Sequence, residues 1–182
     1  MIETERLILR RWRARDVEPY AALTADPEVM TWLGGVMDKH ESADHIDRMG
    51  EHFDLWGYGR YVIERKADGA FLGFTGIARI WPGLPVSGVE IGWRLNRDAW
   101  GQGYATEAAR AATREGLTRF ELPEILAFTA EGNLRSRAVM ERLGYSRDAH
   151  RDFDHPQLLE ADPLRRHVVF VATPTKPWQD EG

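Results

Sequence analysis

The chain has 182 residues, of which 43% are hydrophobic and 29% charged, and its formal net charge is -5. This composition suits one globular domain with a sizeable core, and the mixing of acidic with basic residues disfavours non-specific nucleic-acid binding. The absence of cysteine excludes disulfides, thiolate zinc sites and a cysteine nucleophile. The lack of a long apolar run argues against a signal peptide or a membrane span, so we expect a cytoplasmic protein.

The first third of the chain predicts one strand followed by helices. Residues 6–12 alternate leucine with charged side chains, as a half-buried strand does. Asp16 is a candidate N-cap for the helix that follows it, and Asp26-Pro27 begins a second, short helix. In the next segment apolar residues recur at helical spacing, namely Ile46, Met49, Phe53 and Trp56. Gly57 is expected to end this helix.

The middle of the chain predicts a hairpin and then a strand–turn–helix unit. The strands GRYVIER and AFLGFTGIARI flank the turn signal Asp68-Gly69, and VEIGWRL (89–95) is the next strand. A helical pattern returns over 103–120. Its apolar face is made mostly of small residues, so this helix can lie very close to a sheet; the face comprises Ala105, Ala108, Ala109, Ala112, Leu117 and Phe120.

The last third predicts a strand at 124–130 and a helix that Asn133 caps and Gly144 ends. YSRDAHRDF and RRHVVFVAT are then expected to pair as strands, and residues 174–182 to form a flexible tail. The element order predicts a single α/β domain over residues 1–173. It has a mixed, mostly antiparallel sheet of about seven strands, a βαβ crossover at its centre and about four helices.

The stretch WGQGYATEA (100–108) places a glycine-rich turn between a strand and a helix. A helix N-terminus has unpaired N–H groups and partial positive charge, and glycines let a phosphate approach them closely. Alone, the turn is equally compatible with a tight connection that binds nothing. It lacks the Lys-Ser/Thr ending of a P-loop, and Thr106 stands where a dinucleotide fingerprint needs a third glycine.

Together with three other segments, this stretch resembles the GNAT superfamily of N-acetyltransferases. Gly103 and Ala105 match its acyl-CoA signature, and Trp100 in place of Arg or Gln resembles the branch of ribosomal-protein alanine acetyltransferases (RimJ/RimL type). ETERLILRRW resembles that branch's opening strand, KADGAFLGFTGI its hairpin and EGNLRSRAVMERLGY its second cofactor motif. The resemblance runs from about residue 3 to residue 172 and implies a sheet that is splayed at its centre.

The resemblance implies acetyl-CoA as co-substrate, no metal, and direct transfer of the acetyl group to an amine in a ternary complex. Gly92 predicts a β-bulge or a close backbone approach in the strand that receives the pantetheine arm, the alternative being relief of crowding. Asn133 matches a residue that bonds the pantetheine or caps the last cofactor helix. The implied cofactor contacts also include Ile91, Trp93, Arg94, Leu95, Trp100, Gly101, Gln102, Gly103, Tyr104, Ala105, Thr106 and Ser136.

Three groups are candidates for the chemistry that the resemblance implies. Glu90 stands where the superfamily often has its base, although a carboxylate with a pKa of about 4.3 needs burial or a relaying water to act as one. The alternative for Glu90 is a cross-strand ion pair, for example with Arg79. A backbone N–H near Trp93 or Arg94 would stabilise the oxyanion. Ser136 matches a serine near the leaving sulfur, the alternative being a helix-capping residue.

The acceptor is expected to be an amine, either a small molecule or a peptide N-terminus, that faces segments 26–58 and 148–163. HRDFDH (150–155), with Glu160 and Asp162, predicts an acidic rim that favours a cationic amine. A metal site on one strand face is the weaker interpretation of the same motif; it would use His150, Asp152 and Asp154. Four tryptophans are candidates for lining the acceptor cleft, namely Trp32, Trp56, Trp81 and Trp93.

Two other functions remain open at this point. One is a catalytically silent acyl-CoA-binding or sensor domain on the same fold, in which Glu90 and Ser136 are structural. The other is a nucleotide-dependent enzyme that uses the glycine turn. No nucleic-acid or membrane partner is expected, and a homodimer is left open.

Overall fold

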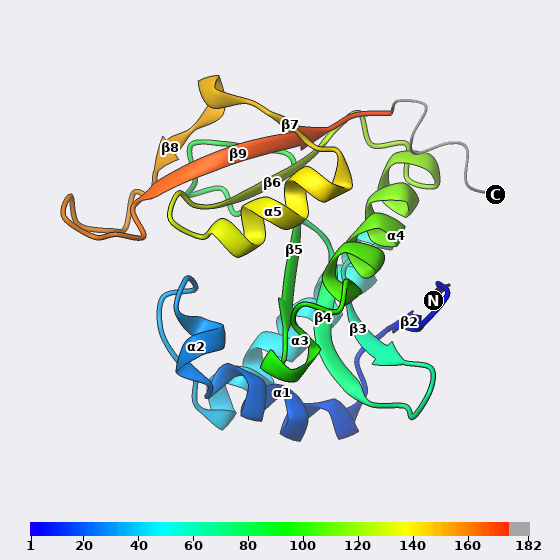
Figure 1. Ribbon diagram of the computed structural model, residues 1–182. Coiled ribbons are helices and arrows are strands. Elements are labelled where there is room, and N and C mark those ends of the chain that lie inside the picture. The colour runs from blue at the N-terminus through cyan, green and yellow to red at the C-terminus, as the bar shows by residue number, and fades with distance from the viewer. Residues whose placement is uncertain (175–182) are drawn as a thin grey trace.

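A mixed β-sheet runs through the whole molecule and carries helices on both faces (Figure 1). The computed structural model describes residues 1–174, so the predicted tail falls almost entirely outside the described residues. The strands are β1 (Ile2–Glu3), β2 (Leu7–Arg10), β3 (Arg60–Arg65), β4 (Phe71–Arg79), β5 (Val89–Leu95), β6 (Ile125–Ala130), β7 (Ser146–Arg147), β8 (Phe153–Asp154) and β9 (Arg166–Ala172). The helices are α1 (Val17–Thr24), α2 (Pro27–Met30), α3 (Lys39–Trp56), α4 (Tyr104–Thr118) and α5 (Leu134–Leu143).

The strand order within the described residues is β1-β2-β3-β4-β5-β6-β9-β7, with β8 also paired to β9. Every pair is antiparallel except β5 with β6, which α4 connects as a βαβ crossover. The predicted mixed, mostly antiparallel sheet is therefore confirmed. Residues 1–174 contain nine strands rather than about seven because two-residue strands are added, and the four-residue α2 brings the α-helices of this range to five.

Helices α4 and α5 cover one face of the sheet, and α1 and α3 pack on the other face against β4 (Figure 1). Of the face predicted for α4, Ala108, Ala109, Ala112 and Leu117 are buried, and Ala105 and Phe120 are partly buried. At Gly116 an added Cβ would lie 2.6 Å from the Ile125 Cδ1 atom, so the helix approaches the sheet more closely than a larger side chain would permit.

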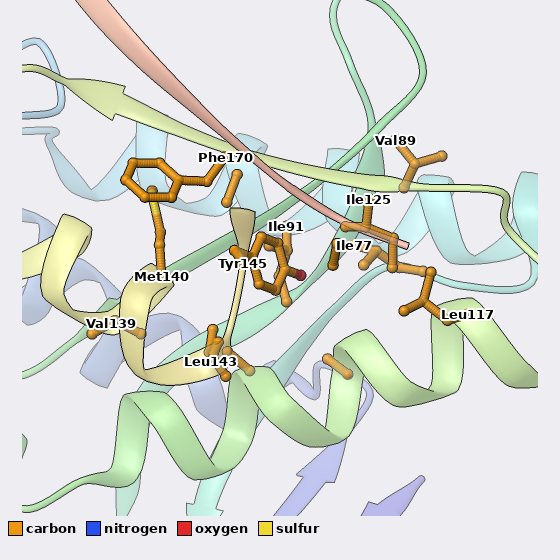
Figure 2. Packing of buried hydrophobic residues seen from close by; sticks show 14 of the residues in the cluster. Ile77, Val89, Ile91, Leu117, Ile125, Val139, Met140, Leu143, Tyr145 and Phe170 are labelled. Carbon is orange, nitrogen blue, oxygen red and sulfur yellow. The ribbon is translucent and has the colours of Figure 1, made fainter. Parts of the chain in front are cut away.

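The largest buried cluster lies between the sheet and the helices α4 and α5 (Figure 2). Ile91 of β5 and Phe170 of β9 meet Leu117 of α4 and Met140 of α5 in this layer. Tyr145 is buried there, and its hydroxyl lies 2.8 Å from the Thr113 hydroxyl. The core anchors the two helices whose N-terminal ends border the functional site.

Most predicted helix ends are confirmed, and one is wrong in an instructive way. The Asp26 carboxylate accepts from the Glu28 amide, and Gly57 and Gly144 end their helices in the left-handed conformation. Asp16 does precede α1, but its carboxylate does not cap that helix. It forms a buried bidentate pair with Arg10, with N–O distances of 2.7 and 2.8 Å.

The closing segment does not form the long strand pair that its sequence predicts. β7 and β8 have two residues each and are separated by a 3-10 turn (Ala149–Arg151), so His150, Asp152 and Asp154 do not alternate on one strand. Within residues 1–174 no group of three potential metal ligands comes together. No helix of the same range is long and apolar enough to cross a membrane.

Candidate active site

The sheet opens between β5 and β6, as the family resemblance implies. The two parallel strands pair at Glu90 and Leu126, yet β5 continues to Leu95 and β6 to Ala130 without further pairing. Figure 1 shows the strands diverging from this point. We call these two strand ends, residues 91–95 and 127–130, the splay. They do not pair with each other, but β4 and β9 pair with their outer edges. The chain leaves β5 toward the N-terminus of α4 and leaves β6 directly into α5, so two helix N-termini border the splay.

The phase of the β4–β5 ladder decides which backbone groups face the splay. The Asn96 amide donates to the Leu72 carbonyl at one end of the ladder, and the Ile80 amide donates to the Gly88 carbonyl at the other. Because hydrogen-bonded pairs alternate in an antiparallel ladder, even-numbered residues of β5 bond to β4 and odd-numbered ones point away from it. Of the two predicted oxyanion donors, the N–H of Trp93 therefore faces the splay, whereas β4 engages that of Arg94.

The turn of residues 100–106, called the cradle here, has the open geometry that a phosphate needs. Gly101 and Gly103 have φ angles of 72° and 82°, a left-handed conformation that favours glycine. A Cβ at Gly101 would have nothing within 4 Å, and one at Gly103 would approach an Arg6 nitrogen at 3.4 Å. The first-turn amides of Tyr104 and Thr106, and the amide between them, donate to no backbone carbonyl of residues 1–174. Unused N–H groups above open space fit the pyrophosphate of CoA.

The loop between β1 and β2 holds the cradle in place, a contact that the sequence did not predict. Arg6 donates to the Gln102 carbonyl at 3.0 Å and forms a 2.7 Å ion pair with Glu107 in the first turn of α4. The Thr4 hydroxyl donates to the same carboxylate at 2.6 Å. Burial pushes the pKa of Glu107 upward, but these hydrogen bonds outweigh it and leave the pKa below its usual value.

Trp100 stands where the general acyl-CoA signature has Arg or Gln. Its side chain contacts both sides of the splay. Its indole N–H donates to the Leu95 carbonyl at 2.9 Å, at the end of β5. The Arg135 guanidinium of α5 lies 4.4 Å from the indole ring centre, at cation–π distance. The aromatic residue thus links the cradle, β5 and α5.

Asn133 caps α5, as one of its two predicted roles requires. Its side-chain oxygen accepts from the Ser136 amide at 3.3 Å, and its side-chain nitrogen donates to the Thr129 hydroxyl at 2.9 Å. Ser136 lies in the first turn of α5, at the end of the splay. Its hydroxyl makes no hydrogen bond to another residue in the described part of the chain.

Glu90 forms a cross-strand ion pair, but with Arg60 rather than Arg79. Arg60 reaches from β3 and donates to Glu90 Oε1 at 2.5 Å, and each side chain is about one-fifth exposed. Arg79 instead lies over the Trp56 ring. Burial raises the pKa of Glu90 by more than Arg60 lowers it, so this carboxyl is a stronger base than an exposed glutamate.

Gly92 makes room for the Arg60 side chain, and the predicted bulge in β5 is wrong. The register from Gly92 to Gly76 of β4 is continuous, and the irregular pairing lies between Ile63 and Glu64 instead. A Cβ at Gly92 would lie 3.4 Å from the Arg60 guanidinium carbon. This contact is close but not a clash, so a close backbone approach of the pantetheine arm at Gly92 stays a prediction beside relief of crowding.

A second group of polar side chains lies on the same face of β5. The Tyr20 hydroxyl is 2.6 Å from His45 Nδ1 and accepts a 3.1 Å hydrogen bond from Arg94. Burial, followed by the charges of Arg94, Arg60 and Arg48, lowers the pKa of His45 to about 3, which keeps its imidazole neutral at pH 7. No sequence motif indicates this group, because its members come from α1, α3 and β5.

One of the four candidate tryptophans lies beside the loop that joins β6 to α5. Trp32, in the segment between α2 and α3, packs on Gly132, where an added Cβ would lie 2.9 Å from the ring. Trp93 belongs instead to the layer under α4. Trp56 and Trp81 are 46% and 49% exposed.

Arginines pair with part of the acidic rim predicted for residues 148–163. Asp152 pairs with Arg147, and Asp154 pairs with Arg165 at 3.5 Å and Arg166 at 3.3 Å, whereas Glu160 and Asp162 form no ion pair within residues 1–174. The preference for a cationic acceptor stays a prediction.

The fold and site agree with the comparisons to known proteins. A family model described as "Acetyltransferase (GNAT) domain" matches residues 6–146, so the chain belongs to the GNAT family of acetyl-CoA-dependent N-acetyltransferases, in its RimJ/RimL-like branch. The uncharacterized protein YkkB of Bacillus subtilis (strain 168) is 32% identical over 147 residues, which cover 78% of this chain and 82% of that protein.

Two solved structures share the fold over nearly the whole chain. The crystal structure of an acetyltransferase from Agrobacterium tumefaciens str. C58 has a TM-score of 0.77 and 29% identity, covering 94% of this chain and 92% of that one. RimL, a ribosomal L7/L12 alpha-N-protein acetyltransferase solved in complex with coenzyme A, has a TM-score of 0.76 over 93% and 95% of the two chains. At 18% identity RimL supports the fold alone.

Proposed function

We propose that this chain transfers the acetyl group of acetyl-CoA to a primary amine by direct attack in a ternary complex, without a metal. The observation that carries the proposal is the splay, which has the open cradle at one end and a half-buried carboxyl at the other. Bound acetyl-CoA supplies an activated thioester. The cradle amides would bind its pyrophosphate, and the odd-numbered backbone groups of residues 91–95 would pair with its pantetheine arm.

The base in this proposal is Glu90. An alkyl ammonium with a pKa of about 10.4 must lose a proton before its nitrogen can bond to the acetyl carbon. Arg60 occupies Glu90 Oε1, and Oε2 has no hydrogen bond to a residue in the described range, so Oε2 can accept that proton directly or through a water. Arg60 is then a positioning residue that orients the carboxylate.

Two further groups stabilise the charge that moves as the carbon–sulfur bond breaks. The Trp93 N–H, which faces the splay, donates to the acetyl oxygen as negative charge develops on it. The Ser136 hydroxyl, which the described residues leave without a partner, donates a hydrogen bond to the leaving thiolate. The N-acetylated amine and CoA are the products, and the amine's proton leaves through Glu90.

One observation favours the alternative of a silent acyl-CoA-binding domain. Glu90 is already paired with Arg60, as a purely structural glutamate would be. Incubation with acetyl-CoA and a panel of amines, with thiol detection of CoA, separates the two functions. Release of CoA that depends on the amine supports transfer, whereas thermal protection by acetyl-CoA without release supports the silent domain.

The same thermal-shift measurement addresses the nucleotide-dependent alternative. Acetyl-CoA should protect the protein, and NAD and ATP should not, because the cradle lacks the lysine and the third glycine of the nucleotide motifs. Protection by NAD or ATP alone would overturn the proposed function.

A further inference from the structure

Arg94 is a partly buried cation for which the described residues supply no carboxylate. Its Nη1 donates to the Tyr20 hydroxyl at 3.1 Å and to the Met37 sulfur at 3.9 Å, both of which are neutral. Its Nε is buried without a hydrogen-bond partner. Residues 1–174 contain ion pairs for many arginines, but none for this one. A partly buried guanidinium without a counter-ion is costly, so an anion arriving at this position would be bound favourably.

The charges around Arg94 also favour an anion. Glu90, a carboxylate on the same face of β5, is engaged by Arg60. His45 stays neutral, and the guanidinium carbons of Arg94 and Arg60 lie 5.4 and 5.7 Å from the centre of the Phe74 ring. Two cations therefore share one carboxylate on this face of β5, and the exposed Arg48 adds positive charge from α3.

The position of Arg94 relative to Glu90 suits a compact molecule. Both residues are even-numbered, so period-2 alternation puts them on one face of β5, and Gly92 between them has no side chain. Four residues of extended strand span about 13 Å between the two Cα atoms. The charged ends are linked through Phe74, because its ring is approached by Arg94 and by Arg60, the partner of Glu90. Phe74, Met37 and Trp12 make the surroundings apolar.

We infer that the acetyl acceptor is an amine that also carries a carboxylate, and that Arg94 binds this carboxylate while Glu90 faces the amine. The fork of a guanidinium matches a carboxylate with two parallel hydrogen bonds. The apolar surroundings select an amino acid with an uncharged side chain. This inference rests on the proposed acetyl transfer and is an alternative to the cationic acceptor that the sequence predicts.

Matched acceptors that differ only in the carboxylate test the inference. The wild-type protein should acetylate leucine and phenylalanine with a kcat/KM at least about tenfold above that for leucinamide and phenylalaninamide. Arg94→Gln should lower kcat/KM roughly 30-fold or more for the amino acids and less than about threefold for the amides, since the backbone N–H groups are retained. Arg79→Gln, which removes an exposed arginine of β4, is the matched control and should change neither.

The outcomes separate this inference from acetyl transfer itself. Equal kcat/KM for acids and amides, or an equal loss for both in Arg94→Gln, would overturn the carboxylate site and leave the acetyltransferase intact. Failure of every amine to release CoA would instead count against the proposed function.

A second measurement requires neither a variant nor turnover. In the presence of CoA, N-acetyl-leucine should raise the Tm of the wild-type protein more than N-acetyl-leucinamide does. Equal shifts from the two compounds would overturn the inference even if Arg94→Gln does not fold.

Discussion

The two ends of the candidate site are built in different ways. The cradle is one continuous stretch, residues 100–106, and the groups that it offers are backbone amides of a helix N-terminus. The acceptor side gathers side chains from β3, β5, α1 and α3, and its contacts join residues separated by 25 to 74 positions. In the proposed function, the difference teaches that local backbone geometry holds the shared co-substrate, whereas side chains brought together by tertiary structure choose the acceptor.

Glu90→Gln is expected to have the largest effect. The change keeps the shape of the side chain but removes its ability to take a proton, so kcat/KM should fall roughly 100-fold or more near neutral pH. The loss should shrink at high pH, where free amine is present. The measurement is a kcat/KM–pH profile of both proteins. A small loss of equal size at every pH would assign Glu90 to the ion pair with Arg60 alone.

Gly103→Val tests the other end of the site. A valine there should weaken acetyl-CoA binding by well over tenfold, because its methyl groups would occupy the space of the phosphates. The variant also places a β-branched residue at a φ of 82°, and Gly69→Val, at 69° in a distant turn, controls for that backbone strain. Titration calorimetry with acetyl-CoA gives the Kd. Unchanged binding in the folded variant would refute the cradle.

Ser136→Ala tests the proposed contact between Ser136 and the leaving thiolate of CoA. Negative charge appears on sulfur only as the bond breaks, so kcat should fall by roughly tenfold while the Kd for acetyl-CoA changes little. A loss of thermal stability with kcat intact would restrict this residue to its place in the Asn133-capped turn.

Arg60→Met tests the contribution of Arg60 to the acceptor end of the site through a shift in the kcat/KM–pH profile. Arg60 lowers the pKa of Glu90, so its removal should let that pKa rise and move the acid limb of the kcat/KM profile to higher pH. Arg79→Met is the control and should leave the limb in place. If Arg60→Met lowers the Tm but not the position of the limb, Arg60 does not act through the carboxyl.

His45 should affect stability and leave turnover near neutral pH little changed. The pKa of His45 is about 3 in the folded protein and 6.5 ordinarily. Between these two pH values the unfolded chain therefore binds a proton at His45 that the folded protein does not bind. Stability should therefore fall as the pH drops from 6.5 toward 3, by at most about 1.4 kcal/mol per pH unit from this residue. His45→Gln should flatten the slope in urea unfolding, whereas His40→Gln on the exposed side of α3 should not.

The sequence by itself determined the local features of this protein. It predicted the cradle, the α4 face of small residues, the hairpin at Asp68-Gly69 and the Asn133 cap, because each depends on residues a few positions apart. The family resemblance added the splay, which spacing alone could not reveal.

Only the tertiary structure decided the contacts of the acceptor side. No local pattern indicates that Arg60 rather than Arg79 reaches Glu90, because Arg60 of β3 lies beside Gly76 of β4, which lies beside Gly92, and this row forms only when three strands are in register. The acidic motif at 150–155 suggested free carboxylates, but β7 and β9 beside it supply arginines that pair with Asp152 and Asp154. An unpaired Arg94 is equally invisible in sequence, since the desolvation of a charge and the absence of its partner are properties of packing.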